Sequence, residues 1–269
     1  MNYGNLLNND FLKVMPSEFI TSLIVMVLIC AFSFTVYFKQ KKADPLKKPK
    51  GIVNIMEMVV EYFDNKTKGD MGYIYLPLAG YFAVLAAYIF LGFFIGMMGI
   101  PNFIYVGEDA ILNSNKLFAS LGNPFTNLAF PLLIGLITWT LMQIVAIRYS
   151  RWGYLKQFVS PIPAVGLLTI WAPFISISLR LFGNALAGFA LSTLIYTAFK
   201  YLFSHFLGLI AVPVVMPLFH AYFDLFSGFI QTLVFVTLTM MNIAQNGPSS
   251  EEIAAMSLKV QVEMEKQSR

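Results

Sequence analysis

Long apolar tracts separated by short polar connections make up most of this chain of 269 residues. Asp224 is the only formally charged residue between 201 and 250. Four further stretches contain no Asp, Glu, Lys or Arg, namely 71–107, 117–147, 157–179 and 181–199. An α-helix needs about 20 residues to cross the ~30 Å hydrocarbon core of a bilayer. The pattern therefore predicts an all-α integral membrane protein with about five membrane helices in a single membrane domain, 1–269.

The first apolar run, 19–38, is long enough for a membrane span and too long for the core of a signal peptide. Six lysines and one aspartate follow in 39–50, and the positive-inside rule places this connection in the cytoplasm and the N-terminus outside. Residues 52–64 then repeat apolar side chains at helical spacing, opposite three acidic residues. This segment predicts an amphipathic helix on the cytoplasmic surface of the membrane.

Two further spans are predicted over 73–98 and 126–147. The connection between them, 99–122, is poor in lysine and arginine and belongs outside, whereas three basic residues after the third span indicate a cytoplasmic loop. These basic residues are Arg148, Arg151 and Lys156.

The block 161–244 contains two apolar stretches, 161–199 and 206–244, each about twice as long as a perpendicular span requires. Prolines lie early in each stretch, and long uninterrupted tracts follow. We therefore expect a long, strongly tilted helical hairpin with a proline kink in each helix, although two short helices in each stretch would also fit. The polar tail 247–269 then ends in the cytoplasm.

Composition supports the membrane class and removes several functions. The chain is 58% hydrophobic and 12% charged, against about 45–50% and 25% in soluble domains. Its net charge of +4 is confined to connections, which excludes a nucleic-acid partner. Cys30 is the single cysteine, so no intrachain disulfide forms. Because no phosphate-binding loop, hydrolase elbow or zinc motif occurs, we expect no catalytic residue, no metal and no cofactor.

Arg180 lies inside the otherwise uncharged tract 157–199. A guanidinium stays protonated in proteins, and inserting it costs about 2.5–3.5 kcal/mol. Such an arginine indicates an ion pathway or a permanent counter-ion, the alternative being a side chain that reaches an interface. The small residues Gly183, Ala187 and Gly188 follow it and predict a surface for a closely packed partner. Packing against the chain's own hairpin is the alternative.

The last apolar stretch contains His220, Asp224, Ser227 and Gln231 at a spacing that places them on one face of an α-helix. An unpaired buried polar group costs about 1–3 kcal/mol, so this face needs water or polar partners. Asp224 is predicted either to pair with Arg180 across the hairpin or to line an aqueous half-channel. Alternatively, these polar residues form a purely structural hydrogen-bond network. His220 fits either a proton path or a packing role.

The segment 176–184, Ser-Ile-Ser-Leu-Arg-Leu-Phe-Gly-Asn, resembles the S-L-x-L-R-L-F-G-N type motif in the penultimate membrane helix of the a subunit of F-type ATP synthases. The segments 223–226 and 229–235 resemble the last helix of that family with its glutamine, and 153–156 resembles its cytoplasmic loop. The five-helix layout extends the likeness to nearly the whole chain.

This resemblance implies a non-catalytic stator subunit of the membrane motor, with two offset aqueous half-channels against a rotating ring of c subunits. It implies b-type peripheral stalk subunits and the lipid bilayer as further partners, and a bacterial plasma membrane as the location. The translocated ion is then the only small substrate. The implied proton-translocation residues are Arg180, Asn184, His220, Asp224 and Gln231. The implied ring-facing small residues are Gly183, Ala187 and Gly188.

Three positions depart from the family pattern. Phe189 stands nine residues after the arginine, where some members have an acid, and 164–171 contains none of the acids that many members carry there. Asn127 replaces the aspartate of the motif at 124–128. We therefore expect Asp224 and His220 to carry more of the proton path.

Two other function classes remain open at this point. An independent cation-coupled secondary transporter would use Arg180 for an anionic substrate and Asp224 for the coupling ion. A non-transporting membrane assembly factor would use neither.

Overall fold

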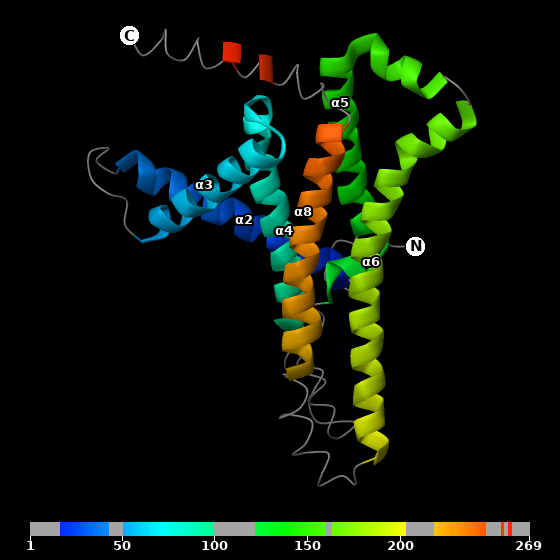
Figure 1. Ribbon diagram of the computed structural model, residues 1–269. Coiled ribbons are helices and arrows are strands. Elements are labelled where there is room, and N and C mark those ends of the chain that lie inside the picture. Colours follow the sequence, from blue (N-terminus) through cyan, green and yellow to red (C-terminus); the bar gives the residue numbers. More distant parts are fainter. Residues whose placement is uncertain are drawn as a thin grey trace, which may run out of the picture. The chain divides into compact units, whose positions relative to one another are not determined.

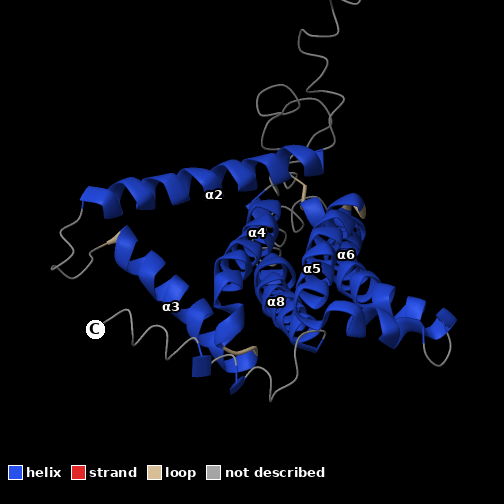
Figure 2. Ribbon diagram, turned by 90° about the horizontal axis from the view of Figure 1, so that it is seen from above, coloured by secondary structure: helices blue, strands red, loops and turns tan. Residues whose placement is uncertain are grey.

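The computed structural model describes five long ranges and two short pieces of the chain: 17–42, 51–98, 122–159, 163–202, 218–245, 254–255 and 258–259. Within these ranges every regular segment is helical (Figure 2). Five helices are long and apolar enough to cross a membrane, namely Glu18–Lys41, Tyr73–Gly96, Ala129–Arg148, Ile170–Ile195 and Leu218–Gln245. The predicted all-α membrane architecture is therefore confirmed. The connection 99–121, the hairpin turn 203–217 and most of the tail 247–269 lie outside the described residues.

The first two helices extend beyond their predicted ends (Figure 1). Helix α2 covers Ser17–Lys42 and α3 covers Ile52–Asp70. The last turn of α3 contains an ion pair between Lys66 and Asp70, 2.9 Å apart, and Gly72 follows with a φ of 98°. A positive φ suits glycine and stops the helix. The segment 52–64 is thus helical as predicted, and the helix continues through a polar end beyond its last apolar residue.

The next two spans begin with tight helical turns. The 3₁₀-helix η2 (Tyr73–Leu78) contains Pro77 and leads into α4 (Ala79–Met98). The 3₁₀-helix η4 (Pro124–Thr126) precedes α5 (Ala129–Val159). The prediction of a loop after residue 147 is wrong, because Arg148, Arg151 and Lys156 continue α5. Long basic side chains reach water from a helix end, so charge alone does not end the helix.

The predicted hairpin consists of α6 (Pro163–Leu202) and α8 (Ser227–Gln245), the latter preceded by a π-helix, η5 (Ala221–Phe226). Helix α6 runs through Pro173 without interruption. Nearby, the indole Nε1–H of Trp139 donates a 2.8 Å hydrogen bond to the backbone oxygen of Ile170. Proline supplies no N–H to the helix, and the bond from Trp139 fixes α5 to α6 in the turn before this proline.

The described segments form two compact units. The first contains Met1–Cys30, Tyr88–Pro131 and Leu179–Thr232. Its close packing depends on two glycines. A methyl group built on Gly92 would lie 2.6 Å from the ring of Phe125, and one built on Gly228 would lie 2.6 Å from Phe93. Phe93 and Phe125 also contact each other, with ring centroids 5.1 Å apart. Helices α4 and α8 therefore approach closely at residues without side chains.

The second unit contains Ala31–Ala87, Leu132–Ser178 and Leu233–Arg269. The rings of Trp139 and Trp171 stack with centroids 4.6 Å apart and join α5 to α6. The hydroxyls of Tyr81 and Thr138 are 2.8 Å apart and join α4 to α5. Here polar side-chain atoms pair within the apolar layer, which is the arrangement that buried polar groups require.

Gly228→Ala is expected to destabilise the chain, because its methyl group would overlap Phe93. Overpacking of this kind costs about 1–3 kcal/mol. Denaturation of the purified chain in detergent measures the effect. Gly183→Ala is the matched control, since nothing lies within 4 Å of a side chain built there. Equal shifts in the two variants would contradict the close approach of α4 and α8.

Candidate functional site

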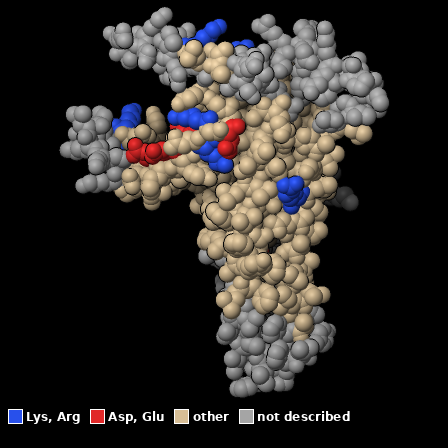
Figure 3. Space-filling view, in the orientation of Figure 1, with Lys and Arg blue, Asp and Glu red and all other residues tan. Residues whose placement is uncertain are grey.

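Arg180 lies on α6, near the middle of the candidate span Ile170–Ile195. Its side chain is exposed. Within the part of the chain that the structure describes, the guanidinium has no hydrogen-bond or ion-pair partner. Figure 3 shows charged side chains gathered over α3, and an isolated blue patch over α6 in an otherwise uncharged face. A permanent positive charge is thus presented on the membrane part of a helix, and no described group of this chain neutralises it.

Helix α6 has a packed face and an open face around this arginine. Leu181 and Ala185 are 0% and 3% exposed, whereas Leu179 and Leu194 are 49% and 67% exposed. Successive residues of an α-helix are separated by about 100°, which places Arg180 between the two faces. The open face is apolar and, around Arg180, is not covered by the described residues.

The three predicted small residues divide between these faces. Gly183 and Ala187 are exposed, and a side chain at Gly183 would meet nothing within 4 Å. Gly188 is buried, because the 100° step turns it toward the hairpin partner, where a methyl group would lie 3.9 Å from Phe223 and from Asp224 Oδ1. For Gly188 the structure therefore favours the alternative, packing against the chain's own hairpin, at the residues before α8.

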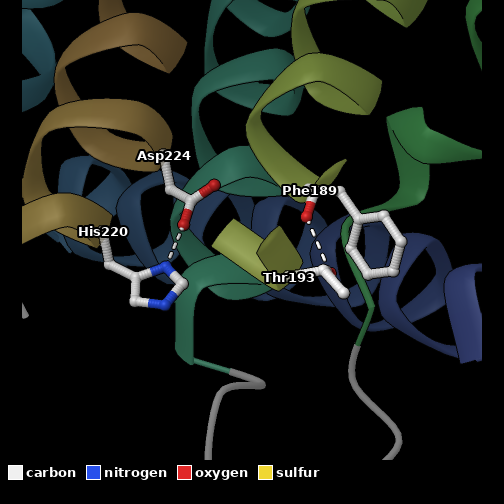
Figure 4. Close-up of polar contacts among 4 residues, drawn as sticks. All are labelled: Phe189, Thr193, His220 and Asp224. Carbon is white, nitrogen blue, oxygen red and sulfur yellow. Dashed lines mark hydrogen bonds and ion pairs between the residues drawn. The ribbon is translucent and has the colours of Figure 1, made fainter. Parts of the chain in front are cut away.

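His220 and Asp224 form a close pair one helical turn apart. The Nδ1 atom of His220 lies 2.6 Å from Oδ2 of Asp224 (Figure 4). The His220 residue is only 8% exposed, and the side chain of Asp224 is 17% exposed. Asp224 lies in the π-helix η5. π-turns occur frequently at functional sites, and this one carries the most informative acid of the chain.

The hairpin is antiparallel, and polar groups meet along it. The Ser227 hydroxyl donates a 2.8 Å hydrogen bond to the side-chain oxygen of Asn184. One turn further along α6, Gly188 faces Phe223 and Asp224. Two polar pairs, Asn184–Ser227 and His220–Asp224, follow one another along the interface between α6 and the helix facing it, and together we call them the polar seam. The seam begins one turn from Arg180 and leads toward the C-terminal end of α6.

Of the two roles left open for Asp224, pairing with Arg180 is not seen within the described residues, where Asp224 pairs with His220 instead. The four polar residues of the last helix are all buried or half-buried, as expected for residues on one packed face, although the π-turn alters their spacing. Gln231 is 6% exposed, and its amide nitrogen has no hydrogen-bond partner within the described part of the chain. A buried donor of this kind ordinarily bonds an acceptor, which here is not among the described residues.

Comparisons with known proteins agree with this arrangement. Residues 19–244 match the sequence profile of the family described as ATP synthase A chain. The chain belongs to the ATP synthase A chain family. It is 30% identical to ATP synthase subunit a of Mycoplasma genitalium over 236 residues, which cover 80% of this chain and 74% of that protein. It is 27% identical to ATP synthase subunit a of Sulfurihydrogenibium over 240 residues, which cover 86% and 96%.

The name of a third relative of this ATP synthase A chain specifies an ion. ATP synthase subunit a, sodium ion specific, of Propionigenium modestum is 29% identical over 168 residues, which cover 61% of this chain and 52% of that protein. The family resemblance read from the motif around Arg180 is confirmed. The chain is therefore a membrane subunit of the ATP synthase type.

The structure shows the surroundings of two residues at which this ATP synthase A chain departs from the family pattern. Phe189, in the place of an acid, is 60% exposed and points away from the His220–Asp224 pair (Figure 4). Asn127 accepts a 3.1 Å hydrogen bond from the backbone N–H of Ala129 and so caps the start of α5. Phe189 therefore leaves the open face of α6 apolar. Asn127 keeps the helix-capping role that an aspartate would have at this position.

Ser192 is not among the predicted residues, although it lies at the packed face of α6. It is 7% exposed, and its hydroxyl has no partner within the described residues. The signal in the sequence is its four-residue spacing after Gly188, which continues the register of the seam.

Proposed function

We propose that this chain is the ion-conducting stator subunit of the membrane motor of an ATP synthase. In this proposal Arg180 faces the carboxylates of a rotating ring of c subunits and separates two aqueous half-channels. The chain itself makes and breaks no covalent bond. Family membership supports the assembly, and the position of Arg180 supports the role within it.

The observation that carries the proposal is an exposed arginine near the middle of a membrane span that no described residue of the chain pairs with. A charge at that depth is costly unless an anion meets it. A carboxylate that approaches Arg180 is favoured in its ionised form and releases its proton. Gly183 and Ala187 are exposed and small, so the backbone of another helix can pack closely against this surface. A ring of helices that carry carboxylates supplies both the anion that Arg180 needs and a helix that can pack against Gly183 and Ala187.

The polar seam supports a half-channel on one side of Arg180. Asp224 and His220 are the titratable side chains of the seam, and both lie near the end of the hairpin that the charge distribution predicts to be outside. Protons that enter there would pass along the seam toward the arginine. A potential of 100 mV delivers about 2.3 kcal/mol per charge crossing the membrane, which the ring can convert to torque.

The remaining assignments follow from this proposal. The subunit would sit in a bacterial plasma membrane with its N-terminus outside and its C-terminus in the cytoplasm, and b-type stalk subunits would hold it against the ring. The sodium specificity in the name of one relative belongs to that protein. For this chain we propose protons, because a histidine–carboxylate pair lines the seam.

Reconstitution separates this function from that of an independent transporter. The purified chain alone in liposomes is expected to show no ion flux, because half of each proposed half-channel wall would come from the ring. The complete membrane sector should conduct protons and should contain a small proteolipid that co-purifies with this chain. Flux of a cation with an anionic substrate through the chain alone would favour the transporter and exclude the stator.

A further inference from the structure

Ser192 is a buried polar group for which the described residues provide no partner. It lies on the packed face of α6 with 7% of its surface exposed, and its hydroxyl oxygen makes no hydrogen bond. The neighbouring Thr193 behaves differently, since its hydroxyl donates to the backbone oxygen of Phe189 at 2.9 Å (Figure 4). A serine in a helix can make the same bond to the preceding turn. Ser192 does not, so its hydroxyl remains available inside the helix pair.

The antiparallel register places Ser192 beside the His220–Asp224 pair. Asn184 meets Ser227, and Gly188, one turn later, meets Phe223 and Asp224. Four residues along α6 thus correspond to three or four residues in the opposite direction on the facing helix, which includes the π-turn Ala221–Phe226. Extending this register by one more turn brings Ser192 toward the level of His220, which is itself 8% exposed.

Gly188 lies one turn before Ser192 on the same buried face of α6. It has no side chain, and a methyl group built on it would still lie 3.9 Å from Asp224 Oδ1, which is ordinary contact. Ser192 enters this part of the interface with a buried hydroxyl that no described residue bonds. Buried waters bond such groups and typically make about three hydrogen bonds.

We propose that Ser192 binds a water molecule at the outer end of the polar seam and holds it against the His220–Asp224 pair. Ser192 is then a positioning residue: it does not exchange protons with the ring but fixes the water through which the pair receives them. Water that bridges two polar groups is nearly as favourable as a direct hydrogen bond. This inference rests on the proposed function, in which the seam conducts protons.

The test uses the complete ATP synthase in inverted membrane vesicles, with equal amounts of assembled subunit verified by immunoblotting. ATP-driven proton pumping is expected to fall roughly 2- to 10-fold in Ser192→Ala, the effect of losing one hydrogen bond in a proton path. Ser192→Thr should retain pumping because it keeps the hydroxyl, whereas Ser192→Val, which has the shape of threonine without the hydroxyl, should pump as slowly as Ser192→Ala. Thr193→Val is the matched control, because it removes an adjacent hydroxyl on the exposed side of α6, and it should pump normally.

A double variant tests the connection to the pair. If one water joins Ser192 to His220, then Ser192→Ala combined with His220→Ala should pump no more slowly than His220→Ala alone. The inference would be overturned if the double variant lost pumping by the product of the two single effects. It would also be overturned by normal pumping in Ser192→Ala and Ser192→Val. Asp224→Asn is measured alongside. If Asp224→Asn slows pumping and Ser192→Ala does not, the water site fails and the proposed function stands, whereas normal pumping in both removes the seam from the path.

Discussion

Arg180→Ala is expected to abolish ATP-driven proton pumping by the assembled enzyme while leaving the chain in the membrane. The substitution removes the only charge in the apolar part of α6 up to residue 199. Without it, ring carboxylates would pass the stator without being driven to ionise, and ions could leak between the half-channels. Loss of one fixed electrostatic group at a reaction centre lowers rates by about 10²–10³, so pumping should fall to background.

Dye quenching in inverted vesicles measures this loss, and passive proton conduction after removal of the soluble catalytic part measures the leak. Arg148→Ala is the matched control, because Arg148 is exposed and lies near the polar end of the candidate span in α5. That variant should pump normally. Intact pumping in Arg180→Ala would exclude the proposed role of the arginine, whatever the control shows.

Arg180→Lys distinguishes charge from shape within the same experiment. Lysine keeps the positive charge but lacks the planar fork of donors with which arginine binds a carboxylate. Partial pumping in Arg180→Lys would mean that the charge is the main requirement. Loss as complete as in Arg180→Ala would mean that the geometry of the guanidinium is needed as well.

The sequence allows most of the helices to be predicted, because length and hydropathy dominate in a membrane. The apolar tracts locate all five candidate spans, and the depth of Arg180 follows from the tract around it. The ends of helices are harder to predict. Arg148 continues α5 rather than starting a loop, since a helix can carry its charged residues into the interface where water solvates them.

The details of the site depend on contacts that a single sequence does not contain. The π-turn at Ala221–Phe226 alters the angular positions of the polar residues, and nothing in the local sequence demands it. Gly188 and Ala187 are neighbours of similar size, yet one is buried and the other is exposed. The direction in which each residue points is set by the partner helix, and the partner's register becomes known only once the Asn184–Ser227 bond is seen.

Asp224→Asn is expected to slow proton pumping strongly and to leave assembly unchanged. Asparagine has nearly the same shape and can still hydrogen-bond to His220, so the helix pair should keep its packing. It cannot take up and release a proton near neutral pH. Removal of a positioned proton-transfer group costs about 10²–10⁴ in rate, and seam water able to carry some protons would limit the loss to roughly 10- to 100-fold.

The pH dependence of pumping decides whether Asp224 conducts protons or only shapes the seam. If the Asp224 carboxylate conducts protons, Asp224→Asn should pump slowly throughout the working pH range. Asp224→Glu should recover part of the rate, because it restores an acid on a longer side chain. Asp64→Asn is the control, since it neutralises a partly exposed acid on α3, away from the hairpin in sequence, and it should pump normally. Normal rates in Asp224→Asn across pH would remove Asp224 from the path. The His220–Asp224 pair would then be a structural contact that holds the start of the last helix against α6, because a hydrogen bond of that kind survives the substitution whereas proton exchange does not.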